Sequence, residues 1–564
     1  MRRVALASVA VLAAVSLAPA SSHADTSSTV TVVGTSDVFD SDLIQQVITP
    51  DFKAANPQYS LNYVSLGTGA AISYAEAGTA SALLVHAASL ENAFVHPPPP
   101  QGSYSLEQYG RAIFYGDYVL LGPPSDPADV MSGSDPSHDV VGAFQKIAAA
   151  GIAGTADFVS RANTAGTAVQ EHQIWALTDP KAVPGLSLCT ISSGSNGGGE
   201  VPTSAANADP TTPCAAGPVT SIPYPTWYHE TNLTQAPNIV AADACNFGNG
   251  NDCYTFTDRG TYDYLVSQGA ISNLQVVGND NSATATGGAT LLVNSFHAYA
   301  INPAAFTSGS VHINTAGATA FLNWLTSPTG QADVTAYQAD APGGSTFVGD
   351  AAPTLTGAVP ARSTAGRALT ITGALKNKVP GTPALSGVKI TLSAIKAGAS
   401  RPVIVGTATT GANGKYSIRY KPTGDASYQV SSPAITKIEI PTPTLTPPFG
   451  DDLQPTATSI GASRVTGTAT IATAKAKKGV VRIKGKLAPA VVGSHATLRV
   501  YAKHASASTK GPKYVKSFKL AAGATSYSIQ LKLARKHTWV LSVHYVNTGQ
   551  ITTGVSPLQS VHVN

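Results

Sequence analysis

The chain has 564 residues, of which 43% are hydrophobic and 12% are charged. At about 100–200 residues per domain, this length predicts three or four domains. The low charge and the single long apolar run, which lies at the start of the chain, exclude a coiled coil and a multi-pass membrane protein.

The net charge of +4 conceals two parts of opposite sign. Residues 25–350 carry 6 Lys and Arg against 27 Asp and Glu, whereas residues 351–564 carry 27 basic residues against 4 acidic ones. An acidic part and a basic part meet different partners, so each needs its own functional explanation.

Residues 1–24 have the pattern of a secretory signal peptide. Arg2 and Arg3 precede an apolar stretch over Val4–Val15, and Ser22-His23-Ala24 fits a cleavage site with small residues. No cysteine lies near this site to receive a lipid. We therefore expect a secreted protein that is not lipid-anchored, and export disfavours nucleic acid as a partner.

The four cysteines, Cys189, Cys214, Cys245 and Cys253, lie within one 65-residue stretch. Their spacing lacks the close pairs typical of a zinc site, and export favours disulfides. Four cysteines allow three pairings, which the sequence leaves open, although sequential pairing closes the shortest loops. We predict two disulfides and no metal site.

Residues 25–350 alternate between short apolar strands and helical segments. Strands are predicted over 29–33, 61–66 and 82–85, and the first two are followed by a small polar turn and a helix. This alternation predicts an α/β domain with a parallel sheet, in which ligands bind at the carboxyl ends of the strands. Residues 178–225 are rich in Gly, Pro and Ser and predict a loop or lid.

Polar turns after these strands could converge on one anion. Thr35 and Ser36 follow the first strand, and Thr68 and Gly69 follow the second, each at the start of a helix. A helix start offers unpaired N–H groups and a partial positive charge. Arg161 follows a further apolar run, and its guanidinium can hold two oxygens of an oxyanion.

In combination, these segments resemble the tungstate-binding proteins of ABC importers, which are close relatives of the phosphate-binding proteins. The resemblance extends from Thr29 to about Tyr337 and implies a two-lobed α/β type II periplasmic-binding fold, over residues 25–350, that closes on its ligand. The runs near Tyr118 and Tyr299 would be the two crossings between the lobes. The matching segments are Gly34–Leu43, Gly67–Gly69, Leu83–Ala87, Asp117–Pro123, Ser160–Thr167, Thr257–Tyr262 and Phe321–Gln331.

Carried over by position, the resemblance implies a ligand site without a cofactor. Two positions depart from the family pattern: Asp37 replaces a hydroxyl residue, and Ala165 replaces a serine. The implied ligand contacts are Thr35, Ser36, Thr68, Gly69, Arg161, Gly166 and Thr167.

His86 bears on the choice of ligand. Phosphate-binding relatives have an aspartate at this position, which accepts a hydrogen bond from the proton that phosphate retains. A histidine can donate instead, so we expect tungstate or molybdate to be preferred over phosphate. The alternative is that His86 packs behind the site without touching the ligand.

Residues 351–564 read as two all-β modules of the immunoglobulin-like sandwich type. The first is expected over 351–448 and ends in a Pro/Thr linker, Pro441–Pro448, and the second over 455–564. The basic residues of the second module form either a solvated face or an attachment to anionic cell-wall polymers. The lysines concerned are Lys475, Lys477, Lys478, Lys484, Lys486, Lys503, Lys510, Lys513, Lys516 and Lys519.

The sequence therefore favours a non-enzymatic receptor that delivers a tetrahedral oxyanion to an ABC permease. A secreted phosphatase is the competing enzyme, but Asp40, Asp42 and His86 match no spacing of metal ligands or of an activated nucleophile. A third hypothesis is a wall-associated adhesin or scavenger whose binding domain feeds no transporter.

Overall fold

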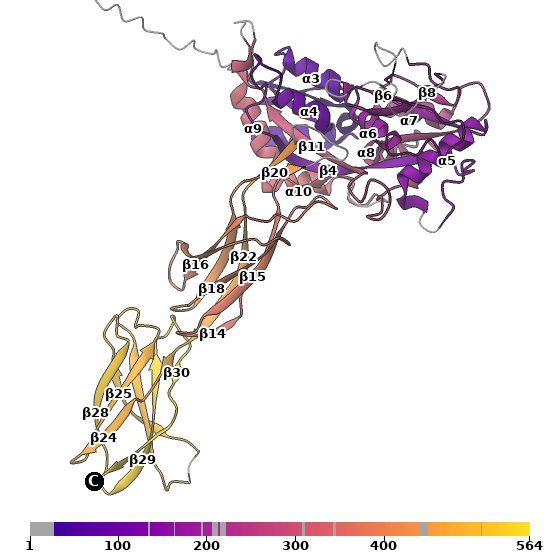
Figure 1. Ribbon diagram of the computed structural model, residues 1–564. Helices are drawn as coiled ribbons and strands as arrows, with labels where there is room; N and C mark the ends of the chain where they lie inside the picture. Colours follow the sequence, from indigo (N-terminus) through magenta and orange to yellow (C-terminus); the bar gives the residue numbers. More distant parts are fainter. Residues whose placement is uncertain are drawn as a thin grey trace, which may run out of the picture.

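The computed structural model describes residues 27–133, 136–162, 164–192, 196–205, 213–214, 222–306, 311–341, 346–439, 449–508 and 510–564. An α/β domain is followed by two β modules that extend from it one after the other (Figure 1). The predicted signal peptide, residues 1–24, lies outside the described residues. No helix among those described has the length and apolarity needed to cross a membrane.

The first lobe of the α/β domain contains the strands predicted near the start of the chain. Its sheet has the order β2-β1-β3-β11-β4, in which β1 pairs in parallel with β2 and β3. Val30, Val32 and Val33 of β1 are fully buried, as in a sheet covered on both faces. The elements are β1 (Thr29–Thr35), α1 (Ser36–Asp40), a π-helical turn (Ile44–Ile48), α2 (Thr49–Ala55), β2 (Ser60–Leu66), α3 (Thr68–Glu76), β3 (Ala82–Val85), α4 (Ala88–Val95), β4 (Gly110–Gly122), β11 (Val293–Ala300), α9 (Thr315–Leu325), α10 (Pro328–Ala336) and β12 (Val348–Gly349).

The second lobe continues the sheet in the order β4-β9-β5-β8, with β10 paired to β4. Its core is aromatic: the Phe144 ring lies 5.3 Å from that of Phe158 and 4.7 Å from that of Trp175, between centroids. Such contacts add to the burial of apolar surface. The elements are α5 (Val140–Ile152), β5 (Ala156–Ser160), α6 (Gly166–Trp175), β8 (Tyr228–Glu230), α7 (Gln235–Ala244), β9 (Asp252–Asp258), α8 (Arg259–Ser267) and β10 (Gln275–Gly278).

The long strand β4 joins the two lobes. Its first half pairs with β11 of the first lobe, and from Tyr118 onwards it pairs with β9 of the second. The predicted crossing at Tyr118 is confirmed. Tyr299 instead pairs with Leu83 inside the first lobe. The second crossing comes before Val293, where the Leu292 carbonyl accepts a hydrogen bond from the Tyr118 N–H (2.8 Å).

The two predicted disulfides are present, and they join Cys189 to Cys214 and Cys245 to Cys253, the sequential pairing. The insertion is more ordered than the expected loop, because β6 (Leu188–Ile191) and β7 (Gly199–Pro202) form an antiparallel hairpin. Cys189, Ile191, Val201 and Ile222 make a small buried core of their own. The described part of the insertion is thus organised around this small apolar cluster.

The first β module has two sheets, in agreement with a sandwich. One sheet is β13-β15-β18 and the other is β14-β22-β19-β16-β17. β22 pairs with β19, with Thr456 opposite Ser432, so this module extends to Thr466, beyond the predicted boundary at 448. The strands are β13 (Thr354–Ala358), β14 (Arg362–Thr364), β15 (Leu369–Lys376), β16 (Lys389–Lys396), β17 (Val403–Thr409), β18 (Lys415–Tyr420), β19 (Ala426–Ser432) and β22 (Thr456–Thr466).

Between β19 and β22 the chain returns to the α/β domain. β20 (Ile435–Glu439) and β21 (Phe449–Leu453) form a hairpin, and β21 adds to the first-lobe end of β4, with Asp451 opposite Gly110. The predicted linker Pro441–Pro448 lies outside the described residues. The chain thus passes between the α/β domain and the first β module three times, at residues 350–354, 432–435 and 453–456.

A buried histidine joins this hairpin to the α/β domain. His297 Nε2 lies 2.9 Å from Asp451 Oδ1, and His297 Nδ1 lies 3.0 Å from Glu91 Oε2. Burial alone would lower the pKa of His297, but the charges of Glu91 and Asp451 outweigh it and raise that pKa well above its usual value. His297 therefore holds the two carboxylates together as a cation.

The second β module again has two sheets. One contains β23-β25-β24 with β28 paired to β25, and the other contains β27-β26-β29-β30 with β31 paired to β29. The strands are β23 (Thr468–Ala469), β24 (Thr473–Lys477), β25 (Val480–Ala488), β26 (Thr497–His504), β27 (Lys513–Lys519), β28 (Ser526–Lys532), β29 (His537–Val546), β30 (Gly554–Val555) and β31 (Gln559–Val563).

Candidate functional site

The residues predicted to form the site lie at the carboxyl ends of four strands. Thr35 ends β1, Thr68 begins α3 after β2, His86 follows β3, and Arg161 follows β5. The first three come from the first lobe, and Arg161 comes from the second. All four are at least 96% buried, so the site lies between the two lobes and away from solvent.

Arg161 is the central cation of the site. Its Nη2 donates to Ser36 Oγ of the first lobe (2.8 Å), while Nη1 donates to Gln235 Oε1 (2.8 Å) and Nε donates to the Leu233 carbonyl (3.2 Å). Gln235 also accepts a hydrogen bond from Thr167 Oγ1 (3.1 Å). The guanidinium is thereby fixed in a plane that links the two lobes.

Further contacts close the lobes on each other. The Gly69 N–H donates to the Thr164 carbonyl (2.9 Å). Gly166, the first residue of α6, lies so close to His86 that a Cβ at this position would fall 2.4 Å from the His86 carbonyl oxygen. The glycine is therefore required for this approach of the lobes.

His86 does not point an unused donor into the site. Its Nε2 lies 2.7 Å from Asp37 Oδ2, and its Nδ1 lies 2.8 Å from the Tyr118 hydroxyl. Burial, followed by the charge of Asp37, raises the pKa of Tyr118 well above its usual value, so the phenol is neutral. The expected hydrogen bond from His86 to the ligand thus has an internal competitor, and the alternative of a packed histidine describes its contacts better.

Asp37 is an ionised carboxylate inside the site. Burial acts to raise its pKa, but His86, the nearby Thr35 hydroxyl and the charge of Arg161 together leave the pKa below its usual value. Its Oδ1 accepts from the Val38 N–H (3.1 Å). Both oxygens of Asp37 therefore have partners within the protein.

Two more carboxylates surround Arg161. Asp40 accepts from the Ala236 N–H (2.9 Å), and burial raises its pKa. Asp258 caps α8 by accepting from the Thr261 N–H (2.8 Å). Burial and then the charge of Asp37 raise the pKa of Asp258 to about 7. Asp258 is therefore partly protonated near neutral pH, which relieves the excess of negative charge.

Two hydroxyls at the site are left over. The Oγ1 atoms of Thr35 and Thr68 are buried and have no hydrogen-bond partner among the described residues. A buried polar group without a partner costs about 1–3 kcal/mol. A small ligand with acceptor oxygens between the lobes would remove this cost.

Three residues of the site were missed from the sequence. Gln235 begins α7 and accepts a hydrogen bond from Arg161. Thr257, near the end of β9, accepts a hydrogen bond from the Gln235 amide, and Asp258 is the last residue of β9. The signal that could have found the last two is the same strand–polar turn–helix pattern used for Thr35 and Thr68. Gln235 offered no such signal, because it follows a loop after β8.

The candidate enzyme residues do not assemble. Asp42 Oδ2 accepts from Gln46 within its own helical segment, Asp40 binds the Ala236 N–H, and His86 faces Asp37 instead. Among the described residues, the only group with metal-ligand geometry is Asp157 with Cys245 and Cys253, and these cysteines form a disulfide. Asp40, Asp42 and His86 thus have separate partners in the structure.

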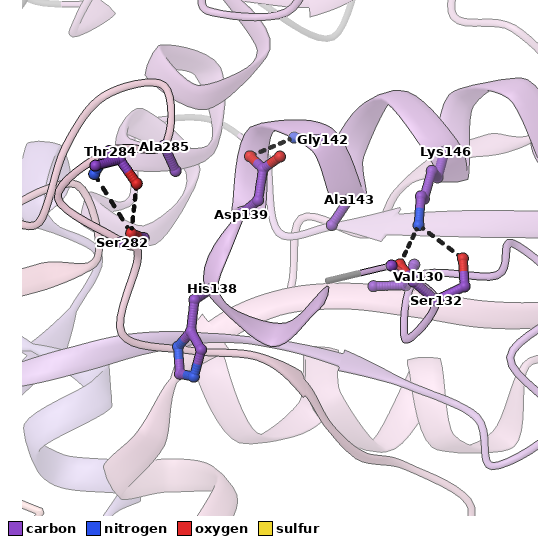
Figure 2. A pocket seen from close by; sticks show the side chains of 11 residues that line it. Val130, Ser132, His138, Asp139, Gly142, Ala143, Lys146, Ser282, Thr284 and Ala285 are labelled. Carbon is purple, nitrogen blue, oxygen red and sulfur yellow. Dashed lines mark hydrogen bonds between the residues drawn. The ribbon is translucent and has the colours of Figure 1, made fainter. Parts of the chain in front are cut away.

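A separate groove of about 340 Å³ lies in the second lobe, at the start of α5 (Figure 2). Lys146 in its lining donates to the carbonyls of Asp129 (2.8 Å) and Ser132 (2.9 Å), and Asp139 caps α5 through the Gly142 N–H. These hydrogen bonds hold the local fold around the groove.

Curated proteins are similar to part of this chain. A protein of Haloferax volcanii named "Putative ABC transporter anion-binding protein" is 31% identical over 278 residues, which are 49% of this chain and 60% of that protein. "Tungstate-binding protein TupA" of Peptoclostridium acidaminophilum is 32% identical over 112 residues, which are 20% of this chain and 35% of that protein. The chain thus spans less than two thirds of either curated relative.

Among solved structures, the tungstate-binding protein TupA from Desulfovibrio alaskensis G20 is 24% identical, with a TM-score of 0.37. The match covers 57% of this chain and 98% of that one. Residues 19–329, more than half of the chain, match the family described as the PBP superfamily domain. The chain therefore belongs to the periplasmic-binding-protein (PBP) superfamily.

Proposed function

We propose that the protein is a secreted, non-enzymatic receptor for a tetrahedral oxyanion, tungstate or molybdate, which it delivers to an ABC permease. The observation that carries this proposal is the buried guanidinium of Arg161, held between the lobes by Ser36 and Gln235. A planar fork of N–H donors, with hydroxyls beside it, suits an ion with several acceptor oxygens.

Asp37 supports a fully deprotonated oxyanion. Its two oxygens are already paired with His86 and the Val38 N–H, so it has less need of a proton from the ligand. Phosphate is the second candidate, because an ionised carboxylate in the site could still accept a hydrogen bond from hydrogen phosphate.

A thermal-shift panel with tungstate, molybdate, phosphate and sulfate tests the proposal. A ligand at 100 times its dissociation constant stabilises the folded protein by about 2.7 kcal/mol. We expect tungstate and molybdate to raise the melting temperature, with sodium chloride of equal ionic strength as the control. The absence of a shift with all four ions would refute the proposal, and a shift with phosphate alone would select the second candidate.

We expect affinity for tungstate to fall as pH rises above about 7. A bound anion favours the protonated form of Asp258, whose pKa is about 7, so binding above this pH takes up a proton. The dissociation constant should rise by up to about tenfold per pH unit, measured by calorimetry between pH 6.5 and 8.5. Asp258→Asn should flatten this dependence.

Asp139→Asn is the matched control, because Asp139 also caps a helix but lies outside the site. Its pH dependence should equal that of the unmodified protein. An unchanged slope in Asp258→Asn would show that this carboxyl does not sense the ligand.

A receptor without a transporter, acting as an adhesin or scavenger, remains the other use of the same site. A transport receptor and a scavenger would bind the ion with the same affinity, but only the transport receptor would also bind a permease. Stimulation of a permease's ATPase activity by the loaded protein, in membranes from the same organism, is expected only of the transport receptor.

A further inference from the structure

One face of the second β module is an array of positive charges. Strands β24, β25 and β28 lie side by side in one sheet (Figure 1). Along each of them, side chains point alternately to a buried apolar face and to an outer face. Ile483 and Leu531 point inward and are buried. The outward basic residues, all exposed, are Lys475, Lys477, Arg482, Lys484, Lys486 and Lys532, and we call them the lysine face.

The register of the strands places these charges close together. Lys475 lies directly opposite Arg482 on the neighbouring strand. Residues two apart along a strand are about 6.7 Å apart, and neighbouring strands are about 4.8 Å apart. Like charges directly opposite each other destabilise a sheet, so this arrangement acts against the fold of the module unless something else compensates it.

The module contains nothing that could neutralise the lysine face. Residues 467–564 include 15 Lys and Arg and not one Asp or Glu. Among the described residues, no ion pair involves any of the six side chains. An ordinary solvated face interleaves both signs of charge, whereas this one is basic only.

The chemistry of the face favours a polyanion over an apolar partner. Its uncharged positions are mostly small or polar: Thr473 on β24, and Ser526, Ser528 and Gln530 on β28. The one large apolar side chain among these strands' outward positions, Val480, is half-buried between Lys477 and Lys532. The exposed large apolar residues of the module lie elsewhere, at Val492, Tyr514, Val515, Val555 and Leu558. Nothing on the lysine face would insert into a lipid layer.

We propose that the lysine face binds a linear phosphodiester polymer of the cell envelope, of the poly(glycerol phosphate) kind. Charges that recur along β25 at Arg482, Lys484 and Lys486 match a ligand whose phosphates recur along an extended chain. Binding offsets the repulsion within the face and attaches the receptor to the envelope without a lipid.

Binding of the full chain to soluble poly(glycerol phosphate), measured against salt concentration, tests this proposal. Release of counterions from six phosphate contacts gives a slope of log K against log salt of about −4, if these polymers behave like single-stranded nucleic acid. Between 50 and 200 mM salt, affinity should therefore fall roughly 300-fold.

Lys475→Gln, Arg482→Gln, Lys484→Gln and Lys486→Gln, combined in one chain, should reduce the slope to about −1.4, since two contacts remain. The matched control replaces Lys510, Lys513, Lys516 and Lys519 by Gln, which removes the same charge from the edge of the opposite sheet. The control should keep a slope near −4. Equal losses in both variants would mean that only net charge matters and would overturn the proposal.

Two further measurements make the test decisive. Thermal unfolding shows that both variants fold, and the lysine-face variant should be no less stable, because it relieves like-charge repulsion. Vesicles of phosphatidylglycerol and a single-stranded DNA of equal charge are the competing ligands. Tighter binding to either of them than to poly(glycerol phosphate) would overturn the assignment of the partner.

Discussion

Arg161→Ala is expected to weaken tungstate binding by roughly 10²–10³-fold. Truncating one partner of a buried, hydrogen-bonded charge pair costs about 2–5 kcal/mol, and Arg161 is buried beside the three carboxylates Asp37, Asp40 and Asp258. The variant loses the guanidinium N–H donors that lie between the lobes. It also loses the positive charge that offsets the negative charge of Asp37. Isothermal calorimetry at pH 7 measures the change.

Arg161→Lys separates charge from geometry. A lysine keeps the positive charge but lacks the planar fork of donors, so we expect an intermediate loss. The matched control is Arg111→Ala, since Arg111 also makes hydrogen bonds, to Asn323 (3.1 Å) and Glu107 (3.0 Å), but lies away from the site. Thermal unfolding at pH 5.5 checks that Arg161→Ala still folds. If the folded variant binds tungstate with unchanged affinity, the proposed site is refuted.

His297→Ala is expected to lower the free energy of unfolding by about 3–5 kcal/mol at pH 6. Removing one partner of a buried ion pair leaves uncompensated charge in the interior, and here Glu91 and Asp451 both lose their cation. Urea unfolding measures this cost. The Trp539→Phe background restricts tryptophan fluorescence to Trp175, Trp227 and Trp324, which all belong to the α/β domain.

The pH dependence of this effect has a definite sign. The pKa of His297 is raised by folding, so its contribution is complete below about pH 6.5 and declines as pH rises towards the folded-state pKa. The difference between the unmodified protein and His297→Ala should therefore shrink from pH 6 to pH 9. His229→Ala is the control, because His229 pairs with Asp157 but is 19% exposed. A difference that grows with pH would contradict a cationic His297.

Local sequence patterns were sufficient for the elements that place the site. β1 and β2 are parallel, so the pattern of strand, polar turn and helix sufficed to place Thr35 and Thr68 at the same edge of the first-lobe sheet. β5, which Arg161 follows, runs antiparallel to β1, so Arg161 reaches the site from the facing lobe, and local patterns could not show this. Whether these side chains touch a ligand stays a prediction.

Long-range pairings were not accessible in the same way. The stretch around Pro441–Pro448 has the composition of a linker, and nothing local indicates that the flanking strands return to β4. Similarly, the pairing of Asp37 with His86 depends on residues 49 positions apart in the sequence, brought together only by the packing of β1 beside β3. Such contacts depend on tertiary packing that propensities do not encode.

The chain crosses the junction between the α/β domain and the first β module three times, which makes that junction stiff. Bending it would have to deform three backbone segments and the β21–β4 pairing at once. The chain passes to the second module only once, after Thr466, but side contacts hold this junction as well. Gln550 of the second module accepts a hydrogen bond from the Asp425 N–H (2.8 Å) and donates one to the Ala397 carbonyl (3.2 Å). Whatever fixes the far end of the molecule therefore also sets the direction in which the α/β domain faces.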